Sequence, residues 1–208
     1  MKTKYFLTII ILQIACFSCK AQDLIISGRT HYTDTPVGGY YKDQNNLLNP
    51  YIGTWVYTNG NTSVTIQLRK LTHKLNLNIY EDVLVGEYRF VENGVEIFNT
   101  LDRFNLDLNN YSDYNINGNT GLLATDIPKC TDCNLGILRI ELTFNDFLKG
   151  VLGSMYFGIS QSDNNKAVVF INSSGLKITV VNPSDPSFDT TTTVGTTIPN
   201  GWYLFIKQ

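Results

Sequence analysis

Two Asn-Gly dipeptides, Asn59-Gly60 and Asn93-Gly94, constrain the fold of this chain more than any other feature. Each stands between runs in which apolar and polar residues alternate. An Asn-Gly pair in that setting is a strong signal for a two-residue β-hairpin turn. No 11-residue window shows a convincing helical period. The pattern therefore predicts an all-β chain built from antiparallel hairpins.

The register of the first hairpin can be predicted from its turn. With Asn59-Gly60 as the loop, Trp55 faces Val64 and Gly53 faces Ile66. These residues then share one apolar face, while the other face is mixed. Because Gly53 has no side chain, it leaves room for the Trp55 indole to lie flat.

Alternating runs and turn residues predict further strands along the chain. The second hairpin pairs residues 83–92 with 95–101, and residues 182–200 form a long loop with Pro183, Pro186 and a threonine run. The expected fold class is all-β, an antiparallel barrel or barrel-like sandwich of about 8–10 strands. The remaining predicted strands are 135–144, 151–160, 167–172, 176–181 and 201–207.

The first 21 residues have the pattern of an export signal. Lys2 and Lys4 precede an apolar run over residues 5–17, which is too short to span a bilayer. Two processing routes are open. In the favoured one, Cys19 is acylated and anchors the protein to a membrane; in the other, cleavage after Ala21 releases a plain secreted protein.

The rest of the chain is expected to form one domain. Residues 1–21 are the signal, 22–50 an irregular lead-in, and 51–208 a single β domain. The net charge of −2 is spread along the chain with no basic run, which argues against nucleic-acid binding. We expect an exported protein, either an outer-membrane lipoprotein or a periplasmic or extracellular one, that touches a membrane only through a lipid anchor.

Cys130 and Cys133 form a CxxC motif beyond the leader. A zinc site would have to recruit both His31 and His73 at arbitrary spacing, and a thioredoxin-like site would need a following helix. The simpler prediction is a small disulfide that closes a loop between strands in an oxidising compartment.

Residues 113–119 match the first half of a calcium loop. Asp113, Asn115 and Asn117 offer oxygen ligands at alternate positions, followed by Gly118. The acid expected at loop position 12 is replaced by Ala124. An Asn- and Gly-rich turn explains the same run without a metal, so both readings stand.

Catalytic signatures are weak in this sequence. There is no G-x-S-x-G motif, and no cofactor is expected. The adjacent acids Glu81-Asp82 could hydrolyse glycosides only if another acid met them across a cleft. Tyr40-Tyr41, beside Gly38-Gly39, could be an exposed aromatic pair that stacks on sugar rings, or could pack against the barrel. We therefore predict no catalytic residues and expect a protein that is not an enzyme.

Several short segments carry a family resemblance through their order. SCKAQ, YIGTW, IYEDVLVGEY and the ending FIKQ resemble an uncharacterised family of small exported Bacteroidota proteins, a domain of unknown function. That family brings no assigned activity, ligand or catalytic residues. The match covers nearly the whole chain beyond the leader.

A more distant resemblance is to lipocalin and calycin barrels, whose first strand carries G-x-W. Gly53-Thr54-Trp55 fits that pattern. These barrels also bring a late basic residue that packs over the tryptophan, and Lys207 is the candidate. The resemblance implies a calycin-like barrel that carries a ligand.

Three functions follow from these observations. The first is an exported non-catalytic β-barrel that binds a small or glycan ligand in an aromatic-lined pocket, with Trp55 at its closed end and Tyr40 and Tyr41 as further contacts. The second is a cell-surface interaction or structural module that uses residues 22–50 and 182–200. The third is a carboxylate-dependent hydrolase. The ligand or cell-envelope partner is not identified by the sequence.

Overall fold

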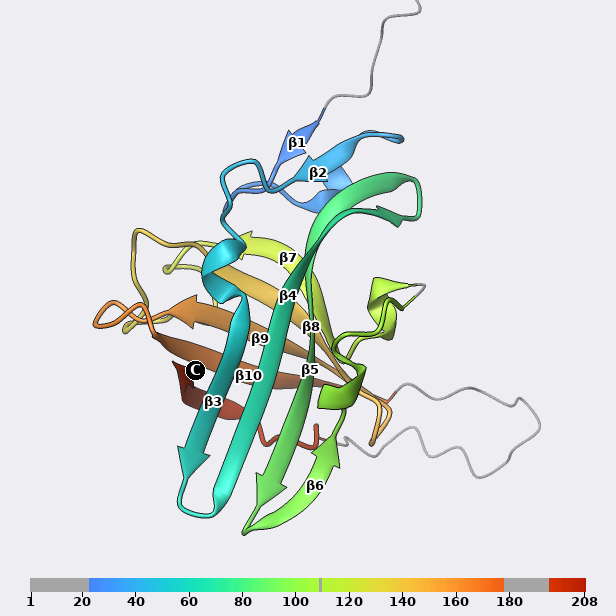
Figure 1. Ribbon diagram of the computed structural model, residues 1–208. Coiled ribbons are helices and arrows are strands. Elements are labelled where there is room, and N and C mark those ends of the chain that lie inside the picture. The colour runs from blue at the N-terminus through green and yellow to red at the C-terminus, as the bar shows by residue number, and fades with distance from the viewer. Residues whose placement is uncertain (1–22, 109, 178–194) are drawn as a thin grey trace, which may run out of the picture.

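The computed structural model describes residues 23–108, 110–177 and 195–208, and its centre is a closed antiparallel barrel of eight strands (Figure 1). Neighbouring strands follow the order β5-β4-β3-β11-β10-β9-β8-β7, and pairing of β7 with β5 closes the ring. The prediction of an all-β antiparallel barrel is therefore confirmed. The barrel strands are β3 (Gly53–Asn59), β4 (Thr62–Asn76), β5 (Ile79–Glu92), β7 (Ile116–Leu122), β8 (Arg139–Asp146), β9 (Val151–Ile159), β10 (Lys166–Lys177) and β11 (Gly201–Lys207).

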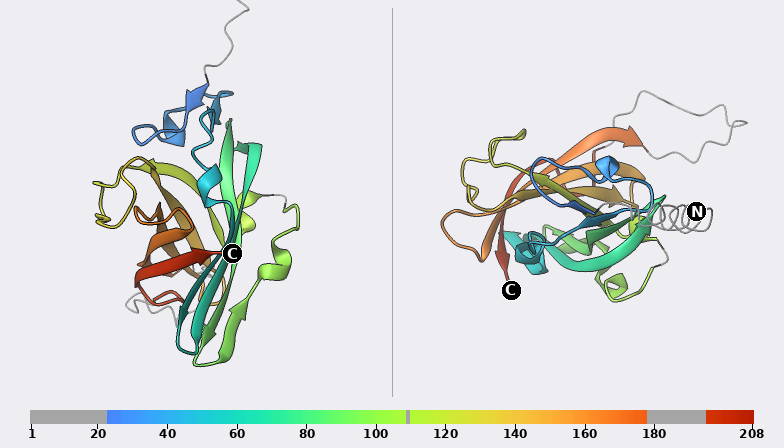
Figure 2. Two further views of the ribbon diagram at one scale, coloured as in Figure 1. Left: turned by 60° about the vertical axis from the view of Figure 1, so that its left-hand side comes forward. Right: turned by 90° about the horizontal axis from the view of Figure 1, so that it is seen from above.

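Three short strands extend the barrel. β1 (Leu24–Ile25) runs parallel to β2 (Tyr40–Lys42), which runs parallel to the start of β5. Figures 1 and 2 show these strands in blue at one end of the barrel, beside the bend between β4 and β5. The lead-in expected to be irregular thus adds to the sheet. β6 (Val95–Asn99) pairs with the other end of β5.

Single 3-10 turns provide the helical structure of the described residues. In that part of the chain, no helix is long and apolar enough to cross a membrane. The loop between β6 and β7, described over residues 100–108 and 110–115, carries two of these turns and packs on the outside of β5, as the left view of Figure 2 shows. The turns are η1 (Tyr32–Asp34), η2 (Asn49–Tyr51), η3 (Leu101–Arg103) and η4 (Tyr111–Asp113).

The first hairpin forms, but its two-residue turn lies one residue further along the chain than predicted, so the predicted register is wrong. Asn59 pairs with Thr62, so the loop is Gly60-Asn61, and Gly60 has a φ of 57° as the first loop residue. Trp55 consequently faces Ile66 rather than Val64. Each pairing shifts by two residues, which preserves the faces because side chains alternate with a period of two.

The second hairpin has the predicted turn. Glu92 pairs with Val95, and both loop residues have positive φ, 51° at Asn93 and 81° at Gly94. Positive φ at both loop positions is the type I′ geometry that favours Asn-Gly.

The other strands were predicted unevenly. β11 has the predicted bounds, and β10 continues past the predicted end at residue 172 to Lys177. Most of the strand predicted over residues 176–181 lies outside the described residues. β7 was missed, because its Asn- and Gly-rich sequence resembles a turn. Most of the predicted loop 182–200 lies outside the described residues.

The barrel interior around Trp55 is filled by side chains. Trp55 is fully buried, and its indole N–H donates a 2.8 Å hydrogen bond to the Tyr51 carbonyl. The Trp55 ring meets Phe157 edge-on with centroids 5.3 Å apart. Apolar side chains from the two strands beside β3 complete this core, among them Ile66 of β4 and Phe205 of β11. Trp55 packs in this core and lines none of the cavities described below, so the aromatic-lined pocket with Trp55 at its closed end stays a prediction.

Lys207 covers the tryptophan, as the resemblance to calycin barrels implied. Its ammonium lies 5.1 Å from the Trp55 ring centroid and donates to the Pro50 carbonyl at 3.1 Å. The lysine stem crosses Gly53, where an added Cβ would lie 2.9 Å from the Lys207 Cε. The missing side chain therefore makes room for the lysine, not for the indole. Burial lowers the pKa of the Lys207 ammonium.

A buried arginine holds the segment between β7 and β8 on the barrel wall. Arg139 is 1% exposed, and its guanidinium donates to three backbone carbonyls: Leu123 at 3.0 Å, Asp126 at 2.6 Å and Pro128. Because backbone oxygens rather than a carboxylate accept these bonds, the side chain fixes the shape of residues 123–130.

Candidate functional site

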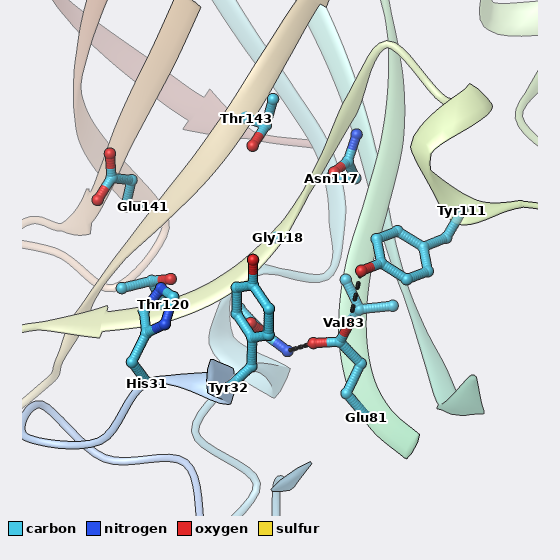
Figure 3. Close-up of a pocket in the computed structure, with 11 residues that line it drawn as sticks. His31, Tyr32, Glu81, Val83, Tyr111, Asn117, Gly118, Thr120, Glu141 and Thr143 are labelled. Carbon is cyan, nitrogen blue, oxygen red and sulfur yellow. Dashed lines mark hydrogen bonds between the residues drawn. The ribbon is translucent and has the colours of Figure 1, made fainter. Parts of the chain in front are cut away.

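A polar cavity of about 310 Å³ lies on the outer wall of the barrel (Figure 3). Leu84, Ile116 and Leu142 point into the core. Glu81, Asn117 and Glu141 line the cavity, and each lies at an odd number of residues from its strand's core residue, so these side chains face outward. η1 and η4 supply the remaining walls, so segments far apart in sequence meet here.

A β-bulge in β7 shapes the floor of the cavity. The register of β7 against β8 shifts between Asn117 and Thr120. Gly118 has a φ of 148°, and a Cβ there would lie 3.0 Å from the Glu141 carbonyl oxygen. Such a bulge re-aims neighbouring side chains. Here it brings Asn119 against Glu81.

Glu81 is the most constrained acid of the cavity. It is 1% exposed, and its two oxygens accept hydrogen bonds from the Tyr111 hydroxyl at 2.5 Å and the Asn119 amide at 2.6 Å (Figure 3). Asn119 also donates to the Asp82 carbonyl at 2.8 Å. Burial and the Glu81 charge raise the pKa of the Tyr111 phenol, so the phenol stays protonated and acts as a donor.

The other walls add further hydrogen-bonding groups. β8 contributes Glu141 and Thr143, β7 contributes Thr120, and η1 contributes His31 and Tyr32. The described lining holds two carboxylates, Glu81 and Glu141, and neither lysine nor arginine. A site with this charge favours hydrogen-bond donors and disfavours anions.

Asp82 faces away from the cavity and organises the N-terminal strands. Its carboxylate accepts the Tyr40 hydroxyl at 2.5 Å and the backbone N–H groups of Asp43 at 2.9 Å and His73 at 3.1 Å. Tyr41 is fully buried, with its hydroxyl donating to a backbone carbonyl at 2.9 Å. Of the two readings of Tyr40-Tyr41, the structure supports packing against the barrel, and neither tyrosine lines the cavity.

The calcium-like run does not gather its oxygens. Asp113 is exposed at the end of η4, whereas Asn115 is fully buried and bonded to Thr100 and to the Asn145 carbonyl. Asn117 belongs to the strand and bonds the backbone of its own chain segment. Within the described ranges, no three His, Cys, Asp or Glu side chains form a group that could hold a metal ion.

The two cysteines of the CxxC motif are joined as a disulfide, with Cα atoms 5.5 Å apart. Cys133 also forms an isolated bridge with Ser160, which ties this turn to the end of β9. Cys19, the expected lipidation site, lies outside the described residues.

One acid of the cavity was identified from the sequence, but the residues that hydrogen-bond to it were not. Glu81 was singled out as one of a carboxylate pair that would need another acid, and Glu141 is an acid that lines the same cavity. Tyr111 and Asn119 carried no signal of their own, because the hydrogen bonds that place them span 30 and 38 residues. Only the closure of β5 against β7 brings them together.

Comparison with known proteins gives a family without an assigned activity. No curated protein and no solved structure matches this chain. A profile described as "Family of unknown function (DUF6705)" matches residues 1–208, the whole of the sequence. The chain therefore belongs to the DUF6705 family, whose function is unknown.

Proposed function

We propose that this protein is an exported, non-catalytic barrel domain that binds a small, hydroxyl-rich ligand in the outer-wall cavity. The observation that carries the proposal is the convergence of polar side chains from β5, β7, β8 and two 3-10 turns around one concave space. Convergent polar groups in a formed pocket are the usual mark of a ligand site. The filled core around Trp55 directs the ligand to the outer wall rather than the interior.

The size and charge of the cavity restrict the ligand. A volume of about 310 Å³ is at the lower end for ligand pockets, which suits one sugar ring or a molecule of similar size. Glu81 and Glu141 accept hydrogen bonds, and the asparagine and threonine side chains can donate or accept them. Neutral or amine-bearing sugars satisfy these groups, whereas sugar phosphates and sugar acids meet like charge.

A thermal-shift titration with purified protein tests this proposal. We expect a neutral or amino monosaccharide to raise Tm by roughly 5–10 °C at a hundred times its Kd. Glu141→Gln and Tyr111→Phe should weaken binding, whereas Glu96→Gln, on exposed β6 away from the cavity, should leave it unchanged. Equal binding of sugar phosphates, or no response from any sugar, would overturn the proposal.

Export and anchoring are supported by the leader. Its basic start, short apolar run and following cysteine have the form of a lipoprotein signal, and the resemblance to exported Bacteroidota proteins points the same way. Mass spectrometry of the mature N-terminus separates the two routes: an acylated Cys19 indicates a lipid anchor, and a free Gln22 indicates plain secretion.

A distant relationship to calycin barrels is part of the proposal. Two features support it: Gly53-Thr54-Trp55 stands in the first strand of the barrel, and Lys207 lies over the tryptophan. The ligand would nevertheless sit outside the barrel, unlike the internal site that the resemblance implied.

A carboxylate hydrolase is the second candidate, because Glu81 and Glu141 line one cavity. Both Glu81 oxygens already accept hydrogen bonds, which ranks this function below ligand binding. A screen with aryl glycosides decides the matter: turnover that disappears in Glu141→Gln would establish catalysis, and a blank screen would remove it.

A further inference from the structure

The outer face of β11 exposes a tryptophan next to other apolar side chains. Trp202 is 46% exposed and contacts Phe170 of β10 in a tilted arrangement, with ring centroids 4.8 Å apart and ring planes at 37°. The neighbouring ring holds the indole against the strand face, so its orientation is fixed before any ligand arrives. We call this surface the Trp202 face; it comprises Tyr156, Val168, Phe170, Trp202, Leu204 and Ile206.

Two hollows adjoin Trp202. One, of about 210 Å³, lies against the disulfide turn and is lined by Trp202, Val168 and Asp132, among others. The other, of about 420 Å³, shares these three residues and adds Gln161 and Lys166. Aromatic, aliphatic and polar groups are thus combined around one ring.

Several hydrogen-bonding groups beside the ring are unused. Among the described residues, the Trp202 indole N–H, the Asp132 carboxylate and the Gln161 side-chain amide have no hydrogen-bond partner. Lys166 forms a surface ion pair with Asp163 at 3.6 Å, with both side chains 39% exposed. An exposed ion pair of this kind is weak, so Lys166 can leave Asp163 and bind a ligand instead.

The disulfide fixes the acid of this face. Cys130 and Cys133 enclose Asp132 in a closed turn. The Gln161 backbone N–H donates to the Asp132 carbonyl at 2.9 Å, and Cys133 pairs with Ser160. The CxxC motif therefore has a structural role, which is to hold Asp132 and Gln161 side by side at the edge of the Trp202 hollows.

We infer that the Trp202 face binds a saccharide chain, with one sugar ring stacked on the Trp202 indole and its hydroxyls bonded to Asp132, Gln161 and Lys166. A pyranose presents an apolar C–H face and an equatorial ring of hydroxyls, which matches a flat indole with polar groups at its edge. A protein partner fits less well, because charged residues are depleted at the centre of protein interfaces and here two stand beside the central ring.

This site is separate from the outer-wall cavity. The two share no lining residue, so each can be removed alone. The inference concerns a polymer held on an open surface, whereas the cavity takes one small ligand.

The test is titration of the purified protein with soluble hexasaccharides: β-1,4-glucose, β-1,4-N-acetylglucosamine, β-1,3-glucose and α-1,4-glucose. Trp202 is one of two tryptophans in the chain, and the other, Trp55, is fully buried. Binding on this face should therefore shift the fluorescence emission of the exposed tryptophan. We expect one hexasaccharide to do so, with a heat of binding by calorimetry and a Kd below about 1 mM.

The variants separate stacking from general apolar contact. Trp202→Ala should weaken binding at least about tenfold, and Trp202→Phe less, because it keeps an aromatic ring. Ile206→Ala, on the same strand face but outside both hollows, should stay within about twofold of the parent. Tyr111→Phe should have no effect, since Tyr111 lines only the outer-wall cavity. Circular dichroism confirms the fold of each variant.

Three results would overturn the inference. The first is a panel that gives no binding at about 5 mM. The second is equal binding by Trp202→Ala and the parent. The third is a concentration-dependent dimer, seen by analytical ultracentrifugation and abolished by Trp202→Ala, which would assign this face to a second copy of the chain.

Discussion

Arg139 should be the most costly polar side chain to replace. Its guanidinium donates to three carbonyls of one surface segment while the side chain is 1% exposed. A hydrogen bond to a charged group contributes about 1.5–3 kcal/mol, but removing the arginine also relieves the desolvation of a buried charge, and the freed carbonyls can rehydrate. For Arg139→Met we therefore expect a net loss of about 2–3 kcal/mol.

The lysine variant separates geometry from charge. Arg139→Lys keeps the charge, but an ammonium on a single stem cannot reach three carbonyls spread over residues 123–128. It leaves a buried cation with too few partners, so Arg139→Lys should be at least as destabilised as Arg139→Met.

Thermal and urea unfolding measure both effects. A loss of 2–3 kcal/mol corresponds to a fall in Tm of roughly 4–12 °C for a domain of this size. Arg89→Met is the matched control, because Arg89 forms an exposed pair with Glu96 and should cost at most about 1 kcal/mol. If Arg139→Lys kept the parent Tm within roughly 1 °C, charge alone would suffice and the reasoning from the carbonyl contacts would be refuted.

Three further substitutions test the closure of the barrel and its buried acid. Gly53→Ala should lower the unfolding free energy in urea by about 1–3 kcal/mol, because φ is 131° and the new Cβ would meet Lys207; a neutral result would contradict both reasons. Trp55→Phe loses the hydrogen bond to the Tyr51 carbonyl and should cost about 2 kcal/mol in the same assay. Glu87 is fully buried, and burial raises its pKa above 4.5. The stability it contributes is present below pH 4.5 and lost as pH rises through the raised pKa, so the Tm advantage of Glu87→Gln over the parent should grow from pH 4 to pH 7; a constant difference would refute this.

The barrel was predictable because its signals are local. Apolar and polar residues alternate along β3 and β4, and this pattern is visible without knowing which residues pair. The buried face of the two strands was therefore predicted correctly even though the turn lies at Gly60-Asn61 instead of Asn59-Gly60. Either placement offers a glycine to a tight turn, and the sequence alone does not choose between them.

The cavity was less predictable because it depends on barrel closure. Asn117 and Asn119 look like turn residues, yet both are buried in a bulged strand whose polar side chains are satisfied across the wall. A polar strand of this kind breaks the apolar pattern that identifies strands. Only its pairing with β5, about thirty residues earlier, turns these asparagines into the lining of a site.

The junction between β3 and β11 has a consequence for the order of folding. Only two residue pairs define its register, and the bond from Lys207 to the Pro50 carbonyl spans 157 residues. β3 is therefore synthesised long before the strand that completes it, and Trp55 stays uncovered through most of translation. Until then the apolar surface around Trp55 is exposed to aggregation. Because β11 is the last strand of the chain, this seam can close only after the other barrel strands have been synthesised.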